Sequence, residues 1–86
     1  MKPVKLDLLT APQCVHCEAF RTFWKGEASN WPNVTFTEVS ALTPEGQSLV
    51  TTHMIFATPG IFLNDELFSS GGFEKEGFLA KLKSVS

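Results

Sequence analysis

Thr10-Ala11-Pro12-Gln13-Cys14-Val15-His16-Cys17 is the stretch that decides the fold, because it joins an expected strand to an expected helix. Before it, residues 4–9 form a dense apolar run, which predicts a largely buried strand. After it, Cys17, Phe20 and Trp24 recur at helical spacing, which predicts a helix that begins near Cys14 and ends at Gly26. Between these two segments, Pro12 disfavours both a strand and a helix. Both cysteines therefore fall where a strand ends and a helix begins.

Turn residues and periodicity predict the rest of the chain. Thr43 is typical of a helix N-cap and Pro44 of a first helical position. The further expected strands cover residues 34–39, the second half of 55–63, and 67–69, and the further helices run from Pro44 to about His53 and from Glu74 to Lys83. The predicted order is β-α-β-α-β-β-α, an α/β architecture whose first two strands run parallel with a right-handed crossover.

Length and charge narrow the range of functions. The chain has 86 residues and a net charge of -2, which fits a single domain over 1–86. No segment is strongly basic, so we expect neither nucleic acid nor a membrane surface as a partner. Lys5 and Asp7 interrupt the first apolar run, so no signal-peptide core is expected, and the expected location is cytoplasmic.

The two cysteines are the candidate chemical centre. A disulfide that closes so short a loop contributes little stability, so the pair is more plausibly catalytic or metal-binding than structural. At a helix N-terminus, free N–H groups and the helix dipole stabilise the thiolate of Cys14 and lower its pKa. Cys17 lies one turn later and faces inward. His16, between them, is a candidate for lowering the pKa of Cys14 further when it is protonated.

Metal binding is the alternative use of the same cysteines. A structural zinc site needs four ligands, and the only further nitrogen ligands are His16 and His53, which are not in motif spacing. An iron–sulfur cluster held by Cys14 and Cys17 across a dimer is chemically reasonable, because thiolates are soft ligands. Intramolecular disulfide formation competes with both, so we expect no metal and no cofactor.

Thr58-Pro59 is a second distinctive feature. A proline just before the apolar run Ile61-Phe62-Leu63 argues against a central strand, unless the peptide bond is cis at the start of that strand. A cis-proline turn exposes the preceding backbone to a bound peptide. Elsewhere, Trp31 and Phe73 fall in expected loops, so we expect them to be the most exposed aromatic residues.

These features together resemble the thioredoxin/glutaredoxin superfamily. The resemblance rests on Cys14-Val15-His16-Cys17 after the first strand, Thr58-Pro59 before a β-hairpin, and Gly71-Gly72 before a final helix. It covers nearly the whole chain and implies a thioredoxin-like fold, with a mixed four-stranded central sheet flanked by helices. It also implies that Cys14 is the nucleophile and Cys17 the resolving thiol. Thr58, Pro59, Gly71 and Gly72 are then the candidate substrate-binding residues.

Within the superfamily, residues 10–17 and Ser70-Gly71-Gly72-Phe73 are similar to small glutaredoxin-like redoxins that supply electrons to ribonucleotide reductase. The resemblance implies a monomeric thiol–disulfide oxidoreductase that reduces protein disulfides and is itself reduced by another protein. Glutaredoxins carry a lysine shortly before the first cysteine, where this chain has Ala11-Pro12-Gln13. We therefore expect a reductase similar to thioredoxin reductase rather than glutathione, although Glu74 resembles an acidic glutathione-binding position.

Overall fold

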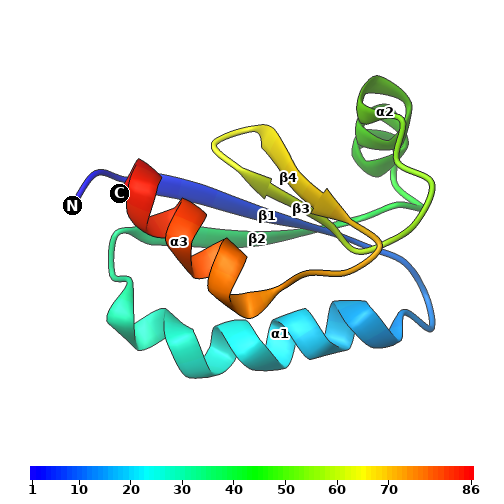
Figure 1. The fold of residues 1–86 in the computed structure, drawn as a ribbon. Coiled ribbons are helices and arrows are strands. Elements are labelled where there is room, and N and C mark those ends of the chain that lie inside the picture. The colour runs from blue at the N-terminus through cyan, green and yellow to red at the C-terminus, as the bar shows by residue number, and fades with distance from the viewer.

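A single mixed sheet of four strands organises the computed structural model, which describes residues 1–86 (Figure 1). The elements are β1 (Val4–Thr10), α1 (Val15–Glu27), the 3-10 helix η1 (Ala28–Asn30), β2 (Val34–Ser40), α2 (Pro44–His53), β3 (Gly60–Leu63), β4 (Glu66–Ser70) and α3 (Lys75–Val85). Apart from η1, this is the predicted order. None of the helices is long and apolar enough to cross a membrane.

The sheet has the strand order β2-β1-β3-β4, with β1 in an interior position. β1 and β2 run parallel from Val4 opposite Val34 to Thr10 opposite Ser40, as the crossover helix between them predicts. β3 is antiparallel to β1 and to β4. The carboxyl ends of β1, β2 and β4 and the amino end of β3 therefore meet at one end of the sheet.

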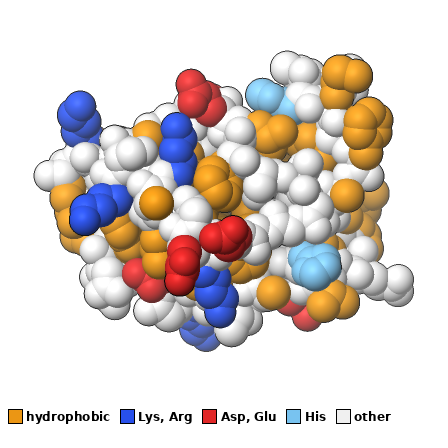
Figure 2. Space-filling view, viewed as in Figure 1, with side chains coloured by type: hydrophobic (Ala, Val, Ile, Leu, Met, Phe, Trp, Pro, Cys, Tyr) orange, Lys and Arg blue, Asp and Glu red, His pale blue; other side chains and the backbone are white.

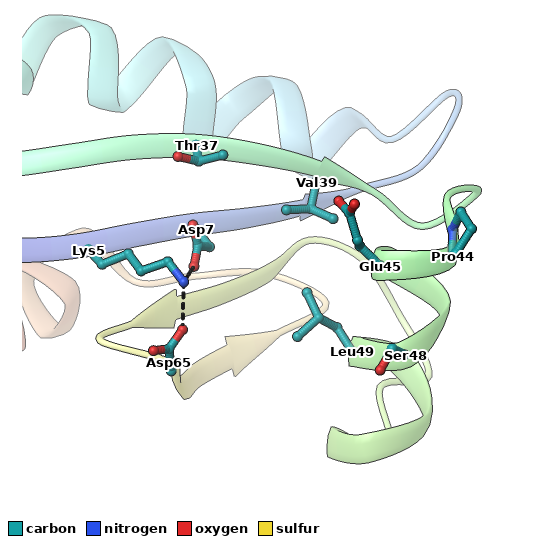
Figure 3. Close-up of a pocket in the computed structure, with 9 residues that line it drawn as sticks. All are labelled: Lys5, Asp7, Thr37, Val39, Pro44, Glu45, Ser48, Leu49 and Asp65. Carbon is teal, nitrogen blue, oxygen red and sulfur yellow. Dashed lines mark hydrogen bonds and ion pairs between the residues drawn. The ribbon is translucent and has the colours of Figure 1, made fainter.

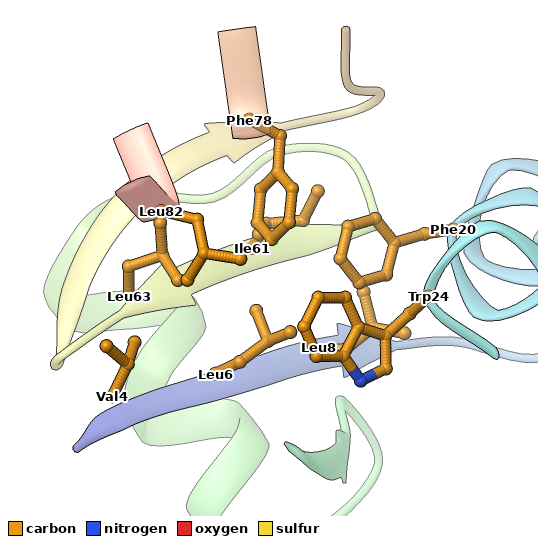
Figure 4. Packing of buried hydrophobic residues seen from close by; sticks show 9 residues of the cluster. All are labelled: Val4, Leu6, Leu8, Phe20, Trp24, Ile61, Leu63, Phe78 and Leu82. Atoms are coloured by element: carbon orange, nitrogen blue, oxygen red, sulfur yellow. The ribbon is translucent and has the colours of Figure 1, made fainter. Parts of the chain in front are cut away.

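Two apolar clusters cover the two faces of the sheet, because side chains alternate along each strand. The larger cluster joins β1 and β3 to α1 and α3 (Figure 4) and consists of Val4, Leu6, Leu8, Phe20, Trp24, Ile61, Leu63, Phe78 and Leu82. The smaller cluster lies on the opposite face and contains Leu9, Ile55 and Phe62, with Leu49 and Val50 of α2 packed against it. Only α2 covers that second face, and it does so with the weak apolar side that its sequence predicts.

The start of α2 is fixed by a tight connection to β2. The Thr43 hydroxyl accepts a hydrogen bond from the Gly46 amide at 3.1 Å and donates one to the Ser40 carbonyl at 2.7 Å. This confirms Thr43 as the N-cap and Pro44 as the first helical residue. Gly46 is buried directly over the end of β2, and a side chain there would overlap the Ser40 carbonyl and lie 2.7 Å from the Ala41 Cα.

The β3–β4 hairpin turns through Asn64 and Asp65, whose φ angles are 51° and 68°. Two consecutive residues with positive φ match the twist of the flanking strands, and Asn and Asp tolerate that conformation. In α1 the expected stop at Gly26 is wrong by a small margin. The helix continues through Glu27, because the following residues keep right-handed backbone angles and lead directly into η1.

Candidate active site

The cysteine pair lies at the sheet end where β1 passes into α1. Gln13 has a φ of 58°, which reverses the chain direction just before Cys14. Cys14 is the N-cap of α1, with extended backbone angles, and its carbonyl accepts a hydrogen bond from the Glu18 amide at 3.2 Å. Cys17 follows in the first turn of the helix. Their Cα atoms are 5.2 Å apart, and the two sulfurs are joined in a disulfide.

The two sulfurs have unequal surroundings. Cys17 is only 1% exposed, whereas Cys14 is half-buried. The Cys14 Sγ accepts a hydrogen bond from the Cys17 amide at 3.1 Å and a second from the Thr58 hydroxyl at 3.4 Å. One donor belongs to the open N-terminus of α1 and the other to the loop before β3. Both donors favour negative charge on Cys14. Cys17 has no such donor and is shielded from solvent.

The loop that carries Thr58 is held against the final turn of the sheet. The Thr58–Pro59 peptide bond is cis, as predicted, and Pro59 is buried. The Pro59 carbonyl accepts a hydrogen bond from the Gly71 amide at 2.9 Å. Gly71 has a φ of 83°, and a side chain there would lie 3.3 Å from the Ala57 Cβ, so glycine suits this position. The structure thus places Cys14, Thr58, Pro59 and Gly71 at one end of the sheet.

The remaining predicted site residues have few contacts with the rest of the structure. His16 lies in the first turn of α1, is exposed, and its side chain makes no hydrogen bond or ion pair. Gly72 follows Gly71, and a side chain there would meet no atom within 4 Å. Glu74, the acidic position considered for glutathione, is the exposed N-cap of α3 and makes no side-chain capping bond.

The expectation for the exposed aromatic residues is wrong. Trp31 donates a hydrogen bond to Glu27 at 3.2 Å and packs against the larger cluster. Phe73 makes an edge-on contact with Phe20, with ring centroids 4.9 Å apart. Both loops fold back onto α1 and leave these rings partly buried. The exposed aromatic residue is Phe56, at 90%, which lies in the first half of segment 55–63, ahead of the expected strand.

A pocket of about 590 Å³ lies elsewhere, between α2 and the second face of the sheet (Figure 3). None of the predicted site residues lines it. Lys5 lies at its edge and donates a hydrogen bond to Asp65 at 2.8 Å. That bond, followed by the charge of Asp7, raises the pKa of Lys5 above its ordinary value. The pocket is separate from the disulfide.

The structure offers no metal centre. It brings together no group of three or more His, Cys, Asp or Glu side chains able to hold a metal ion. His53 instead packs edge-on against Phe62, with ring centroids 4.9 Å apart. A four-ligand zinc site therefore finds no third ligand beside Cys14 and Cys17 within the chain.

Comparisons with known proteins agree with this geometry. No protein-family model matches the chain. A thioredoxin of Methanocaldococcus jannaschii is 28% identical over 83 residues, which is 96% of each protein. A poplar thioredoxin h superposes with a TM-score of 0.71 at 17% identity, over 96% of this chain and 76% of that one. Glutaredoxin 1 from Francisella tularensis gives 0.55 at 16% identity, over 95% of both chains.

Fold, disulfide and sequence similarity define the class: the chain is a thioredoxin-like thiol–disulfide oxidoreductase. Within that class the similarity extends over 96% of the Methanocaldococcus jannaschii thioredoxin and 95% of Glutaredoxin 1. Proteins of this kind exchange disulfides with a substrate and with a reductase. The resemblance inferred from residues 10–17, 58–59 and 71–72 is thereby confirmed.

Proposed function

We propose that the protein reduces disulfides of other proteins by dithiol exchange, with Cys14 as the nucleophile and Cys17 as the resolving thiol. The observation that carries this proposal is the unequal environment of the two sulfurs. Cys14 is half-buried, at a helix N-terminus and next to two hydrogen-bond donors, whereas Cys17 is 1% exposed. A substrate sulfur can reach only the first of them directly.

The exchange has two steps. The Cys14 thiolate attacks one sulfur of the substrate disulfide, so that a mixed disulfide forms and the other substrate sulfur leaves as a thiolate. Cys17 then loses its proton and attacks the Cys14 sulfur, which breaks the mixed disulfide and releases the second substrate thiolate. Two electrons pass to the substrate, its thiolates take up protons, and the protein is left with the Cys14–Cys17 disulfide found in the structure.

Residues around the sulfur are assigned supporting roles in this proposal. His16 stabilises the Cys14 thiolate when its imidazole is charged, because it lies in the first turn of the same helix. Thr58, Pro59, Gly71 and Gly72 form the substrate-binding loops. The support is the hydrogen bond from the Gly71 amide to the Pro59 carbonyl, which holds these loops together beside Cys14.

The proposed electron donor is a reductase similar to thioredoxin reductase, rather than glutathione. Residues 8–17 carry no lysine or arginine that could bind a glutathione carboxylate. We further propose that residues 1–86 act as one domain and as a monomer, and that the protein works in the cytoplasm, since a dithiol reductant needs a reducing compartment.

Two assays test these assignments. Cys17→Ser should trap a mixed disulfide with insulin, used as a model protein disulfide, whereas Cys14→Ser should trap none. Equal trapping by both variants would contradict the assignment of the nucleophile. With NADPH, thioredoxin reductase should support faster turnover than glutathione with its reductase. The reverse order would identify glutathione as the donor and leave the exchange mechanism intact.

A further inference from the structure

The pocket on the second face of the sheet is not used by the cysteine chemistry. Its volume is about 590 Å³, and β1, β2, α2 and the β3–β4 turn all contribute to its lining (Figure 3). Pockets that hold small molecules commonly have volumes of ~300–1,000 Å³ and combine an apolar surface with a few polar groups. Val39 and Leu49 form an apolar wall here, and charged side chains lie on either side of it. The pocket therefore has the size and the mixed lining of a small-molecule site.

Asp7 lines this pocket and is the one buried charged residue of the chain, at 7% exposure. Its neighbours Leu6 and Leu8 enter the larger cluster, so the Asp7 side chain lies on the opposite face of the sheet. The Asp7 carboxylate pairs with the Lys5 ammonium at 3.4 Å, but that ammonium lies closer to Asp65, at 2.8 Å. A buried carboxylate is costly unless opposite charge and hydrogen bonds compensate for it. One shared lysine leaves Asp7 able to accept a second cation.

The net negative charge of the chain resides in the lining of this pocket. The lining contains three carboxylates, from Asp7, Glu45 and Asp65, and one ammonium group, from Lys5. Its formal charge equals the net charge of -2 that the whole chain has from seven basic and nine acidic residues. The charged side chains elsewhere therefore cancel, and Figure 2 shows the two signs interspersed on the side of the molecule that carries α3. A ligand with two positive charges would neutralise the pocket.

The carboxylates lie at two ends of the pocket, with the apolar wall between them. Asp7 and Asp65 lie at one end, whereas Glu45, which has no ion-pair partner, projects from the first turn of α2 beside Val39 (Figure 3). The parallel register places Val39 two residues beyond Asp7, which is ~6.6 Å along the strands and matches an aliphatic chain of about four carbons. The side chains do not converge as metal ligands do, since no group of three or more could hold a metal ion.

We propose that this pocket binds a small aliphatic diammonium compound. One ammonium group pairs with Asp7, the other pairs with Glu45, and the methylene groups between them pack along Val39. The Lys5 ammonium stays with Asp65, its nearer partner. Charge-assisted hydrogen bonds hold the two ends of the ligand, and burial of its methylene groups adds to the affinity. Neither cysteine takes part, so the proposal does not rest on the proposed function.

Titration of the oxidised protein with diaminobutane, which carries an amine at each end, tests the proposal. Amide NMR spectra are recorded at neutral pH and constant ionic strength. The signals of Asp7, Val39 and Glu45 should shift together and saturate. Butylamine has one ammonium group and should bind about tenfold more weakly, because it lacks one charge-assisted contact. Butanediol, which has the same length and no charge, should cause no saturable shift.

Variants at the two ends of the pocket separate specific binding from general attraction. Asp7→Asn keeps the side-chain size and should weaken diaminobutane binding by about tenfold. Glu38→Gln is the matched control and should leave the affinity unchanged, because Glu38 lies opposite Leu8 and pairs with Arg21 of α1 at 2.8 Å, away from the pocket. Glu45→Gln should lower the affinity for diaminobutane to that of butylamine and leave butylamine binding unchanged. This third readout serves if Asp7→Asn does not fold.

Three results would overturn the proposal. Equal affinities for diaminobutane and butylamine would show that the pocket has no second cation position. Equal weakening by Asp7→Asn and Glu38→Gln would show only a general attraction of cations to an acidic protein. Saturable shifts confined to residues outside the pocket would place the ligand elsewhere. In each case the disulfide exchange at Cys14 and Cys17 stands, since insulin reduction tests it separately.

Discussion

At the scale of single residues, the Cys14 sulfur is the point where two parts of the fold converge. The Cys17 amide belongs to the helix that Cys14 caps, and the Thr58 hydroxyl comes from a loop 44 residues further along the chain. A hydrogen bond to a charged acceptor contributes more than one to a neutral acceptor. Both donors should therefore strengthen when reduction leaves a thiolate at Cys14.

Thr58→Val tests the contribution of the hydroxyl. Valine has nearly the same size but no donor, so the Cys14 pKa should rise by about one unit, which is ~1.4 kcal/mol. Ultraviolet absorbance of the thiolate against pH measures this shift in the reduced protein. Thr58→Ser keeps the donor and serves as the control. Identical titration curves for the parent and Thr58→Val would show that the hydroxyl does not stabilise the thiolate.

His16→Ala tests electrostatic tuning from the helix. A charged imidazole one turn from the sulfur contributes on the order of 1 kcal/mol at an effective dielectric constant near 20. The variant should raise the Cys14 pKa and lower the reduction potential by a few tens of mV, since about 30 mV corresponds to ~1.4 kcal/mol for two electrons. His16 is exposed, so high salt should shrink the difference. Superimposable titration curves would leave the helix N-terminus as the source of stabilisation.

At the scale of elements, substituting two helical glycines by alanine should change the free energy of unfolding in opposite directions. Gly46→Ala should lower the free energy of unfolding by about 1–3 kcal/mol, because the new Cβ overlaps the Ser40 carbonyl at the start of α2. Gly26→Ala places a Cβ where no atom lies within 4 Å, so better helix propensity should raise the free energy of unfolding by about 0.5–1 kcal/mol. Urea denaturation measures both. A stable Gly46→Ala variant would contradict the close packing of α2 on β2.

The elements also show which features sequence can predict. Strand and helix boundaries near the cysteines followed from apolar periodicity and from Pro12, which are local signals. The α2 N-cap followed from Thr43 and Pro44 for the same reason, and the structure bears it out. The predicted end of α1 at Gly26 was wrong, because the end of a helix depends on where the residues after it pack. Here they continue directly into η1.

At the scale of the whole molecule, the site depends on contacts between distant segments. The approach of Thr58 to Cys14, and of Gly71 to Ala57 and Pro59, follows from the strand order and register, so residue spacing alone could not give it. Exposure was hard to predict for the same reason. Trp31 and Phe73 lie in loops that fold onto α1, whereas Phe56, next to the buried Ile55, projects into solvent.

The larger apolar cluster helps to position the disulfide. Aromatic rings of α1 and α3 fill the larger cluster, where Phe20 and Phe78 meet edge-on with centroids 5.2 Å apart. That packing holds the axis of α1, and hence its N-terminus, relative to β3 and the Thr58 loop. The position of the Cys14 sulfur is therefore set by the core as well as by its neighbours along the chain.

Competitive alkylation of the reduced protein tests the central claim most directly. Limiting iodoacetamide at neutral pH, followed by peptide mass spectrometry over time, gives separate rates for Cys14 and Cys17. Cys14 should react at least about tenfold faster, because it is more accessible and its position at the helix N-terminus lowers its pKa and so raises its thiolate fraction at neutral pH. Equal rates, or faster labelling of Cys17, would contradict the assignment of Cys14 as the attacking thiolate.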